Sequence, residues 1–290
     1  MEFAKLHGTG NDFVVIDAPS RGGAYADRAR AICDRHFGVG ADGLIVAEPS
    51  PVAAVRMRIF NADGSEAEMS GNGMRCLVKY VVDRGLVRPA GDAFDVETGA
   101  GVLGVRVERD AGGRVTRVRQ DMGMPRLAPE EIPLALEAIA AGGSGERAIT
   151  CAHAIDVAVD GARLAVTPVS MGNPHAVLFQ EAPVEAYPLE RLGPLVEHHP
   201  LFPKRTNFEV VRMLGRDRAE MRVWERGVGE TLSCGSGASA VMVAARLNDL
   251  ADGALRLRVP GGELDLEWDG AGAVVLTGPV VEVFRGVWPD

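Results

Sequence analysis

The chain has 290 residues, of which 47% are hydrophobic and 24% charged, and its formal net charge is −9. This composition is typical of a soluble globular protein large enough for two cores. The acidic balance, without a basic stripe, argues against nucleic acid and anionic membranes as partners. No apolar run approaches the roughly 20 residues that span a bilayer, and residues 1–7 lack the features of a signal peptide. We therefore expect a cytoplasmic protein.

The first half of the chain is predicted to be rich in strands. Short β-branched or alternating runs predict strands at three places, residues 14–16, 44–46 and 55–60. After Gly73 the hydrophobic spacing becomes helical, which predicts a helix with Gly85 at its C-cap. Alternation then predicts a hairpin over residues 102–121.

The second half repeats this order after a linker-like stretch at residues 127–147, which we expect to form a loop or a short helix. A strand is predicted at residues 221–224 and a helix at about 238–248. Further strands are expected at residues 255–259, 264–268 and 273–276. This order lacks the alternation of a doubly wound fold. We expect an α/β protein of the α+β type, in which each half is a curved, mostly antiparallel sheet or barrel around one helix.

One segment of the chain occurs twice, 164 positions apart. Between residues 57–73 and 221–237, five of 17 positions are identical, whereas chance would give about one. Ser70 falls on Cys234 in this register. The repeat predicts two domains that arose by duplication and are related by a pseudo-twofold axis. We expect one domain at residues 1–120 plus 278–290, the other at 121–277, and the active site in the cleft between them.

Each copy of the repeat contains a glycine-rich turn that leads into a helix, at residues 70–73 and 234–237. The first N–H groups of a helix are unpaired and attract anions, and glycines allow a ligand to approach them. Two such helix starts can hold a substrate carboxylate and stabilise the charge that develops when its α-carbon is deprotonated. The same field lowers the pKa of a thiol, so we expect Cys234 to act as a base. Two such residues facing each other suit removal of a proton from one face of a carbon and its return to the other.

Other chemistry is not indicated. Residues 7–12 contain glycines but no phosphate-binding loop motif, and no hydrolase triad is apparent. The four cysteines have no metal-binding spacing, so we expect no metal site, and we expect Cys33, Cys76 and Cys151 to be small buried hydrophobes. None of the three lysines lies in a recognisable context for anchoring pyridoxal phosphate. We therefore expect no cofactor.

Several motifs together resemble the diaminopimelate epimerase family along essentially the whole chain. They are His7–Phe13, Asn61–Ser65, Gly71–Cys76, Gly172–His175, Thr206–Asn207, Glu225–Thr231 and Cys234–Gly237. The resemblance implies an enzyme that interconverts LL- and meso-2,6-diaminopimelate with two bases and without pyridoxal phosphate, for lysine and peptidoglycan precursors. It also implies two similar domains around an active-site cleft, and it leaves a homodimer open.

The resemblance also implies roles for individual residues. Cys234 matches a catalytic cysteine, and His175 and Glu225 match residues that tune the thiols. The backbone groups that hold the reacting carboxylate match Gly71, Asn72, Gly235 and Ser236. The side chains that recognise the amino-acid groups match Asn11, Asn61, Asn173, Asn207, Glu225 and Arg226. Arginine can clamp a carboxylate and glutamate can pair with an ammonium group. Gly43 departs from members that have glutamine there.

Ser70 is the departure that matters, because the family has its first catalytic cysteine at this position. A hydroxyl is a far weaker acid than a thiol. The chain is then an engineered variant, a natural member in which a neighbour assists Ser70, or a protein with another activity or none. The alternatives are a related epimerase or dehydratase for a cyclic amino acid such as hydroxyproline, and an impaired homologue that only binds amino acids. Buried Cys76 cannot replace Ser70, because it lies six residues further into the helix.

Overall fold

The computed structural model describes residues 1–18, 23–89, 91–135 and 154–289. The chain divides into two compact units, Met1–Asp121 with Thr277–Asp290, and Met122–Leu276. Cys151 and the larger part of the expected linker, residues 136–147, lie outside the described residues.

The first unit contains two helices, α1 and α2. Their bounds are Ala26–Cys33 and Gly71–Asp83. Its strands are β1 (Glu2–Gly8), β2 (Asn11–Asp17), β3 (Gly43–Glu48), β4 (Val55–Asn61), β5 (Glu66–Ala67), β6 (Ala93–Thr98), β7 (Gly101–Arg109), β8 (Val115–Asp121) and β18 (Val281–Val287).

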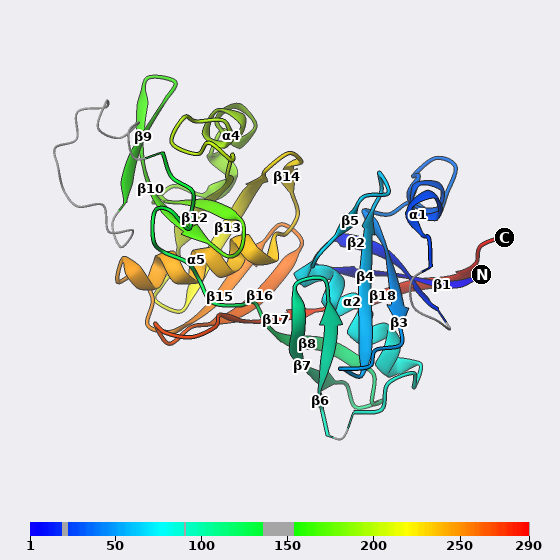
Figure 1. The fold of residues 1–290 in the computed structure, drawn as a ribbon. Coiled ribbons are helices and arrows are strands. Elements are labelled where there is room, and N and C mark those ends of the chain that lie inside the picture. The colour runs from blue at the N-terminus through cyan, green and yellow to red at the C-terminus, as the bar shows by residue number, and fades with distance from the viewer. Residues whose placement is uncertain (19–22, 90, 136–153, 290) are drawn as a thin grey trace. The chain divides into compact units, whose positions relative to one another are not determined.

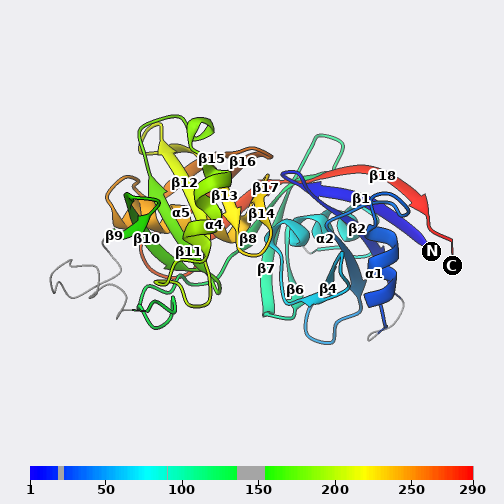
Figure 2. The same ribbon diagram turned by 90° about the horizontal axis from the view of Figure 1, so that it is seen from above.

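Pairing in the first unit is mostly antiparallel. Strand β1 pairs with β18 and β2, β3 with β4, and β7 with β6 and β8, all antiparallel. The pairs β2–β3 and β4–β6 are parallel. Helix α2 packs against β1, β2, β3, β4 and β8, as Figures 1 and 2 show.

The described part of the second unit contains α4 (Leu189–Glu197), α5 (Gly235–Leu247) and the short 3-10 helix η1 (Val184–Ala186). Its strands are β9 (Ile155–Val159), β10 (Ala162–Ser170), β11 (Pro174–Phe179), β12 (Asn207–Met213), β13 (Arg218–Glu225), β14 (Gly229–Thr231), β15 (Ala254–Val259) and β16 (Gly262–Glu267). Strand β17 (Val275–Pro279) includes the division between the units at residues 276 and 277.

The second unit repeats the pairing order of the first. Strands β10 and β11 are antiparallel, β11 and β12 parallel, β12 and β13 antiparallel, β13 and β15 parallel, and β15 and β16 antiparallel. Both parallel pairs thus recur at equivalent places. Helix α5 packs against β10, β11, β12, β15 and β16 (Figures 1 and 2).

Each of these long helices lies in an apolar core of its own unit. In α2 every residue from Asn72 to Val82 is buried, and in α5 every residue from Gly237 to Ala245. Valines and methionines of the surrounding strands fill the space between helix and sheet. The expected fold class, a curved and mostly antiparallel sheet around a central helix, is therefore confirmed. Among the described residues, no helix is long and apolar enough to cross a membrane.

Candidate functional site

Ser70 begins helix α2 in the first unit. Its backbone is extended, and its Oγ accepts a hydrogen bond from the backbone N–H of Gly73 at 3.1 Å. Gly73 is required for space, because a Cβ there would lie 3.1 Å from Ile45 and 3.2 Å from Ile59. Ser70 thus caps the helix by this hydrogen bond, and the helix start packs closely against strands β3 and β4.

A buried polar network supports this helix start. Asn72 Nδ2 donates to Asn11 Oδ1 at 3.1 Å, and Arg75 donates to Asn72 Oδ1 at 2.8 Å and to Thr9 Oγ1 at 3.2 Å. Gln120 Nε2 donates to the carbonyl of Gly71 at 3.0 Å. Burial lowers the pKa of the Arg75 guanidinium to about 10. The structure therefore brings Asn11 and Asn72 into direct contact, and Arg75 supports Asn72 from within the helix.

Asn61 ends strand β4. Its Nδ2 donates to Ser65 Oγ at 2.9 Å within the turn between β4 and β5. Strands β4 and β5 are also joined by an ion pair, in which Arg58 donates to both carboxylate oxygens of Glu66 at 2.7 and 2.8 Å. The repeat has the same arrangement, where Arg222 donates to both oxygens of Glu230 at 2.7 and 2.8 Å. These paired contacts fix the hairpin that precedes each glycine-rich turn.

Cys234 begins helix α5 in the second unit. The backbone N–H of Gly237 donates to its sulfur at 3.4 Å, and Ser236 Oγ lies 3.4 Å from that sulfur. Burial, together with the charges of Glu225 and Glu209, raises the pKa of the thiol well above its ordinary value. This direction is opposite to the lowering of the thiol pKa that the sequence predicted from the helix start.

Glu225 lies at the end of β13 and is partly buried. Thr231 Oγ1 donates to its Oε1 at 2.5 Å. Burial raises the pKa of Glu225, and the charge of Glu209 adds to the increase. Glu225, Glu209 and Cys234 thus form one group of interacting acids beside the start of α5.

His175 is fully buried on β11 and contacts two side chains. Its Nδ1 lies 2.7 Å from Glu209 Oε1, and its Nε2 lies 3.1 Å from Asn173 Oδ1. Of the sequence-predicted residues, His175 and Asn173 are therefore in direct contact. Glu209 was missed, although the repeat aligns it with an apolar residue, Ile45, which is a detectable signal.

Asn207 connects this region to Arg226. Its Nδ2 donates to the carbonyl of Pro174 at 2.9 Å, and its Oδ1 accepts the backbone N–H of Arg226 at 2.9 Å. The Arg226 side chain is exposed, and its Nη1 donates to the carbonyl of Lys204 at 3.1 Å. An exposed guanidinium bound to a single carbonyl retains donors for a substrate carboxylate.

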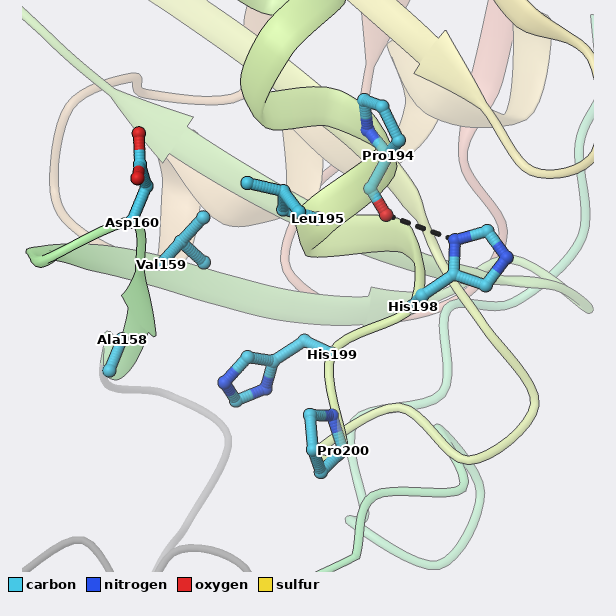
Figure 3. Close-up of a pocket in the computed structure, with 8 residues that line it drawn as sticks. All are labelled: Ala158, Val159, Asp160, Pro194, Leu195, His198, His199 and Pro200. Atoms are coloured by element: carbon cyan, nitrogen blue, oxygen red, sulfur yellow. Dashed lines mark hydrogen bonds between the residues drawn. The ribbon is translucent and has the colours of Figure 1, made fainter.

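A separate surface hollow of about 510 Å³ lies beside α4 (Figure 3), lined by Ala158, Val159, Asp160, Pro194, Leu195, His198, His199 and Pro200. None of the predicted site residues lines it. His198 Nδ1 donates to the carbonyl of Pro194 at 2.9 Å, and His199 Nδ1 accepts the backbone N–H of Leu201 at 3.2 Å. No group of His, Cys, Asp and Glu among the described residues is arranged to hold a metal ion.

Solved structures with this fold come from several enzyme groups. The chain matches a PhzF-family phenazine biosynthesis protein from Bacillus anthracis with a TM-score of 0.68 and 16% identity, covering 99% of this chain and 98% of the other. A probable proline racemase from Agrobacterium radiobacter matches with a TM-score of 0.66 and 16% identity, over 99% and 92%. The fold is therefore that of the epimerase and PhzF group of proteins.

Sequence comparison gives the particular family. The family model described as diaminopimelate epimerase matches residues 3–128 and 167–283. The diaminopimelate epimerase of Moorella thermoacetica is 47% identical over 292 residues, covering 100% of this chain and 99% of the relative. That of Desulfovibrio desulfuricans is 47% identical over 288 residues, covering 99% and 97%. The chain belongs to the diaminopimelate epimerase family.

Proposed function

We propose that this chain is an amino-acid epimerase that interconverts LL- and meso-2,6-diaminopimelate. The observation that supports this best is the pair of equivalent helix starts, at which Ser70 and Cys234 each accept the N–H of the third following residue. In this proposal the two residues serve opposite faces of one α-carbon.

The substrate carboxylate would be bound by backbone N–H groups at the starts of the two long helices. Gly71 and Asn72 provide them in one unit, and Gly235 and Ser236 in the other. These dipoles are oriented before the reaction begins, so they stabilise the charge that develops as the α-proton leaves. The amino-acid groups, including those of the distal centre, would be recognised by Asn11, Asn61, Asn173, Asn207, Glu225 and Arg226.

Proton transfer would use Cys234 and residue 70 in alternating roles. In each turnover one removes the α-proton and the other returns a proton to the opposite face. Ser70 is the weaker partner, because a hydroxyl does not ionise near neutral pH without a base. We therefore propose slow turnover that Ser70 limits in at least one direction.

Two of the three lysines have partners that hold their ammonium groups. Lys5 pairs with Asp12 at 2.5 Å, and Lys79 pairs with Asp83 at 2.7 Å and donates to the carbonyl of Val115. Both ammonium groups thus have structural partners in the first unit. The proposed reaction relies instead on the electrostatic field of the helix starts.

Proton NMR in D2O tests the function. The purified chain is incubated with LL- and, separately, meso-diaminopimelate, and the α-proton signals are followed; trans-4-hydroxyproline serves as the comparison substrate. Interconversion with loss of α-protons supports the proposal. Exchange at one centre without inversion would show that Cys234 works alone. Reaction only with hydroxyproline would show that the chain is instead an enzyme for a cyclic amino acid. Binding of diaminopimelate without exchange of its α-protons would show that the chain only binds amino acids.

We also propose a cytoplasmic location, from the sequence features given above, and a homodimer, from the family resemblance. The acidic charge of −9 supports a small-molecule substrate rather than a nucleic acid or a membrane as the partner. Light scattering of the purified chain measures the oligomeric state, and a monomer at working concentration would contradict the dimer.

A further inference from the structure

Glu209 occupies a position in the sheet where the fold requires only an apolar residue. It lies on β12 between Val177 of β11 and Val223 of β13, both of which belong to the core under α5. The equivalent residue in the first unit is Ile45, which lies between Val15 and Ile59 in the core under α2. Packing alone therefore does not explain a carboxylate at position 209.

The Glu209 side chain is fully buried, and its two oxygens have different surroundings. Oε1 lies 2.7 Å from His175 Nδ1. Oε2 has no hydrogen-bond partner among the described residues. Burying a carboxylate with only one of its oxygens satisfied is unfavourable. A carboxylate buried in this way therefore suggests that its charge has a function.

Oε1 is also directed at the start of α5. A Cβ added to Gly237 would lie 2.7 Å from Glu209 Oε1 and 3.4 Å from Cys234 Sγ. The carboxylate oxygen and the sulfur are therefore at most about 6.1 Å apart. At position 73 of the first unit the same added atom would instead contact the methyl groups of Ile45 and Ile59. Only the helix start that carries the cysteine has a carboxylate beneath it.

We propose that Glu209 is a positioning residue whose buried carboxylate, held by His175, keeps Cys234 as a protonated thiol in the unliganded chain. The negative end of the Glu209–His175 pair lies toward α5, so it competes with a thiolate for the positive helix start. Cys234 is thereby the proton donor at rest, so the first base must act from position 70, where the Ser70 hydroxyl needs the help of a neighbouring group. The inference about Glu209 rests on the proposed function only where it states which residue removes the first proton.

The titratable groups that face Cys234 come from three strands. Glu209 projects from β12 and Glu225 from β13, while His175 of β11 acts through Glu209. The first turn of α5 contains no acidic residue. The charges of Glu225 and Glu209 both raise the pKa of Cys234, after burial, so removing one of them isolates its share.

The test measures how alkylation of Cys234 by iodoacetamide depends on pH, with peptide mass spectrometry to report this cysteine alone. In the unmodified chain we expect a midpoint above about 8.5, the value of a free cysteine. In Glu209→Gln, which keeps the shape and loses the charge, we expect the midpoint to fall by about one pH unit. That is about a tenfold rise in the thiolate fraction below the midpoint.

Glu220→Gln is the matched control, because Glu220 is a buried carboxylate of the same unit whose partners are Arg212 and Arg258. It should leave the Cys234 midpoint unchanged. A shift below about 0.3 pH unit in Glu209→Gln, or an equal shift in the control, would overturn the proposal. So would an ordinary midpoint in the unmodified chain, a measurement that needs no variant to fold.

The assay uses no substrate and needs no turnover. If the midpoint shifts but neither diaminopimelate isomer reacts, the proposed function fails while the role of Glu209 in the thiol's protonation stands. If diaminopimelate reacts but the midpoint stays fixed, the inference about Glu209 fails alone.

Discussion

Ser70 and Cys234 occupy the same position in equivalent helices, and their side-chain atoms accept equivalent hydrogen bonds. Ser70 Oγ accepts the N–H of Gly73 at 3.1 Å, and Cys234 Sγ accepts that of Gly237 at 3.4 Å. The difference between the two units at this position is therefore one of acidity and not of placement. The exchange of oxygen for sulfur changes which proton transfers each side can perform.

Restoring sulfur at position 70 should increase turnover. In Ser70→Cys we expect kcat for diaminopimelate to rise about 100-fold, because a positioned acid or base of suitable acidity contributes about 10²–10⁴-fold. Interconversion is followed by α-proton NMR in D2O. Ser70→Ala is the control: if it is as active as the unmodified chain, the Ser70 hydroxyl has no part in proton transfer. An unchanged rate in Ser70→Cys would remove position 70 from the mechanism.

Removing the thiol of Cys234 should abolish epimerisation. Cys234→Ala is expected to lower kcat at least about 100-fold, since the remaining hydroxyl at position 70 cannot serve both faces. The same NMR assay measures the loss. Cys33→Ala provides a comparison, because Cys33 is a buried thiol of the first unit whose pKa burial raises to about 11. Equal losses in the two variants would assign the effect to folding.

Arg226 should contribute to binding rather than to the chemical step. Its exposed guanidinium is bound to one carbonyl, that of Lys204, and the proposal assigns it to a substrate carboxylate. Arg226→Ala should raise KM about tenfold or more with little change in kcat, as loss of uniform binding does. Steady-state kinetics with LL-diaminopimelate separates the two constants. Arg218→Ala, at an exposed arginine where β13 begins, should change neither constant. A fall in kcat alone in Arg226→Ala would assign Arg226 to catalysis.

The ion pairs of Asp12 make stability depend on acidic pH. Burial raises the pKa of Asp12, but hydrogen bonds from Arg35 and Lys5 outweigh it and lower the pKa from 3.8 to about 2. Because the folded pKa lies below the unfolded one, the stabilisation is present above pH 3.8 and is lost as pH falls toward 2. Asp12→Asn should cost about 2 kcal/mol of unfolding free energy at pH 7.

Urea denaturation at pH 7 and at several values below pH 4 measures this effect. The difference between Asp12→Asn and the unmodified chain should shrink as the pH falls through this range. Asp156→Asn changes an exposed carboxylate and should show no such dependence. A difference that stays constant down to pH 2 would show that the Asn variant is destabilised by packing rather than by lost charge.

Much of the fold follows from local patterns that the sequence contains. Alternation and helical spacing predicted the long helices, which begin three residues earlier than expected at Gly235 and at Gly71 because the glycine-rich turns themselves form the first helical turn. The hairpin over residues 102–121 is present as β7 and β8. Helices α1 and α4 were not predicted, and neither were several strands, among them β1, β6, β9 to β12 and β18.

The sequence by itself determined the duplicated turns, their capping residues and the family to which the chain belongs, because these depend on residue types at fixed spacing. Only the tertiary structure decided the protonation of Cys234. Burial and the carboxylates of Glu209 and Glu225 raise the pKa of this thiol, although it lies at a helix start. In the sequence, the repeat only aligns position 209 with the apolar residue Ile45. The effect of the Glu209 carboxylate on Cys234 follows only from the tertiary structure, in which β12 packs against α5.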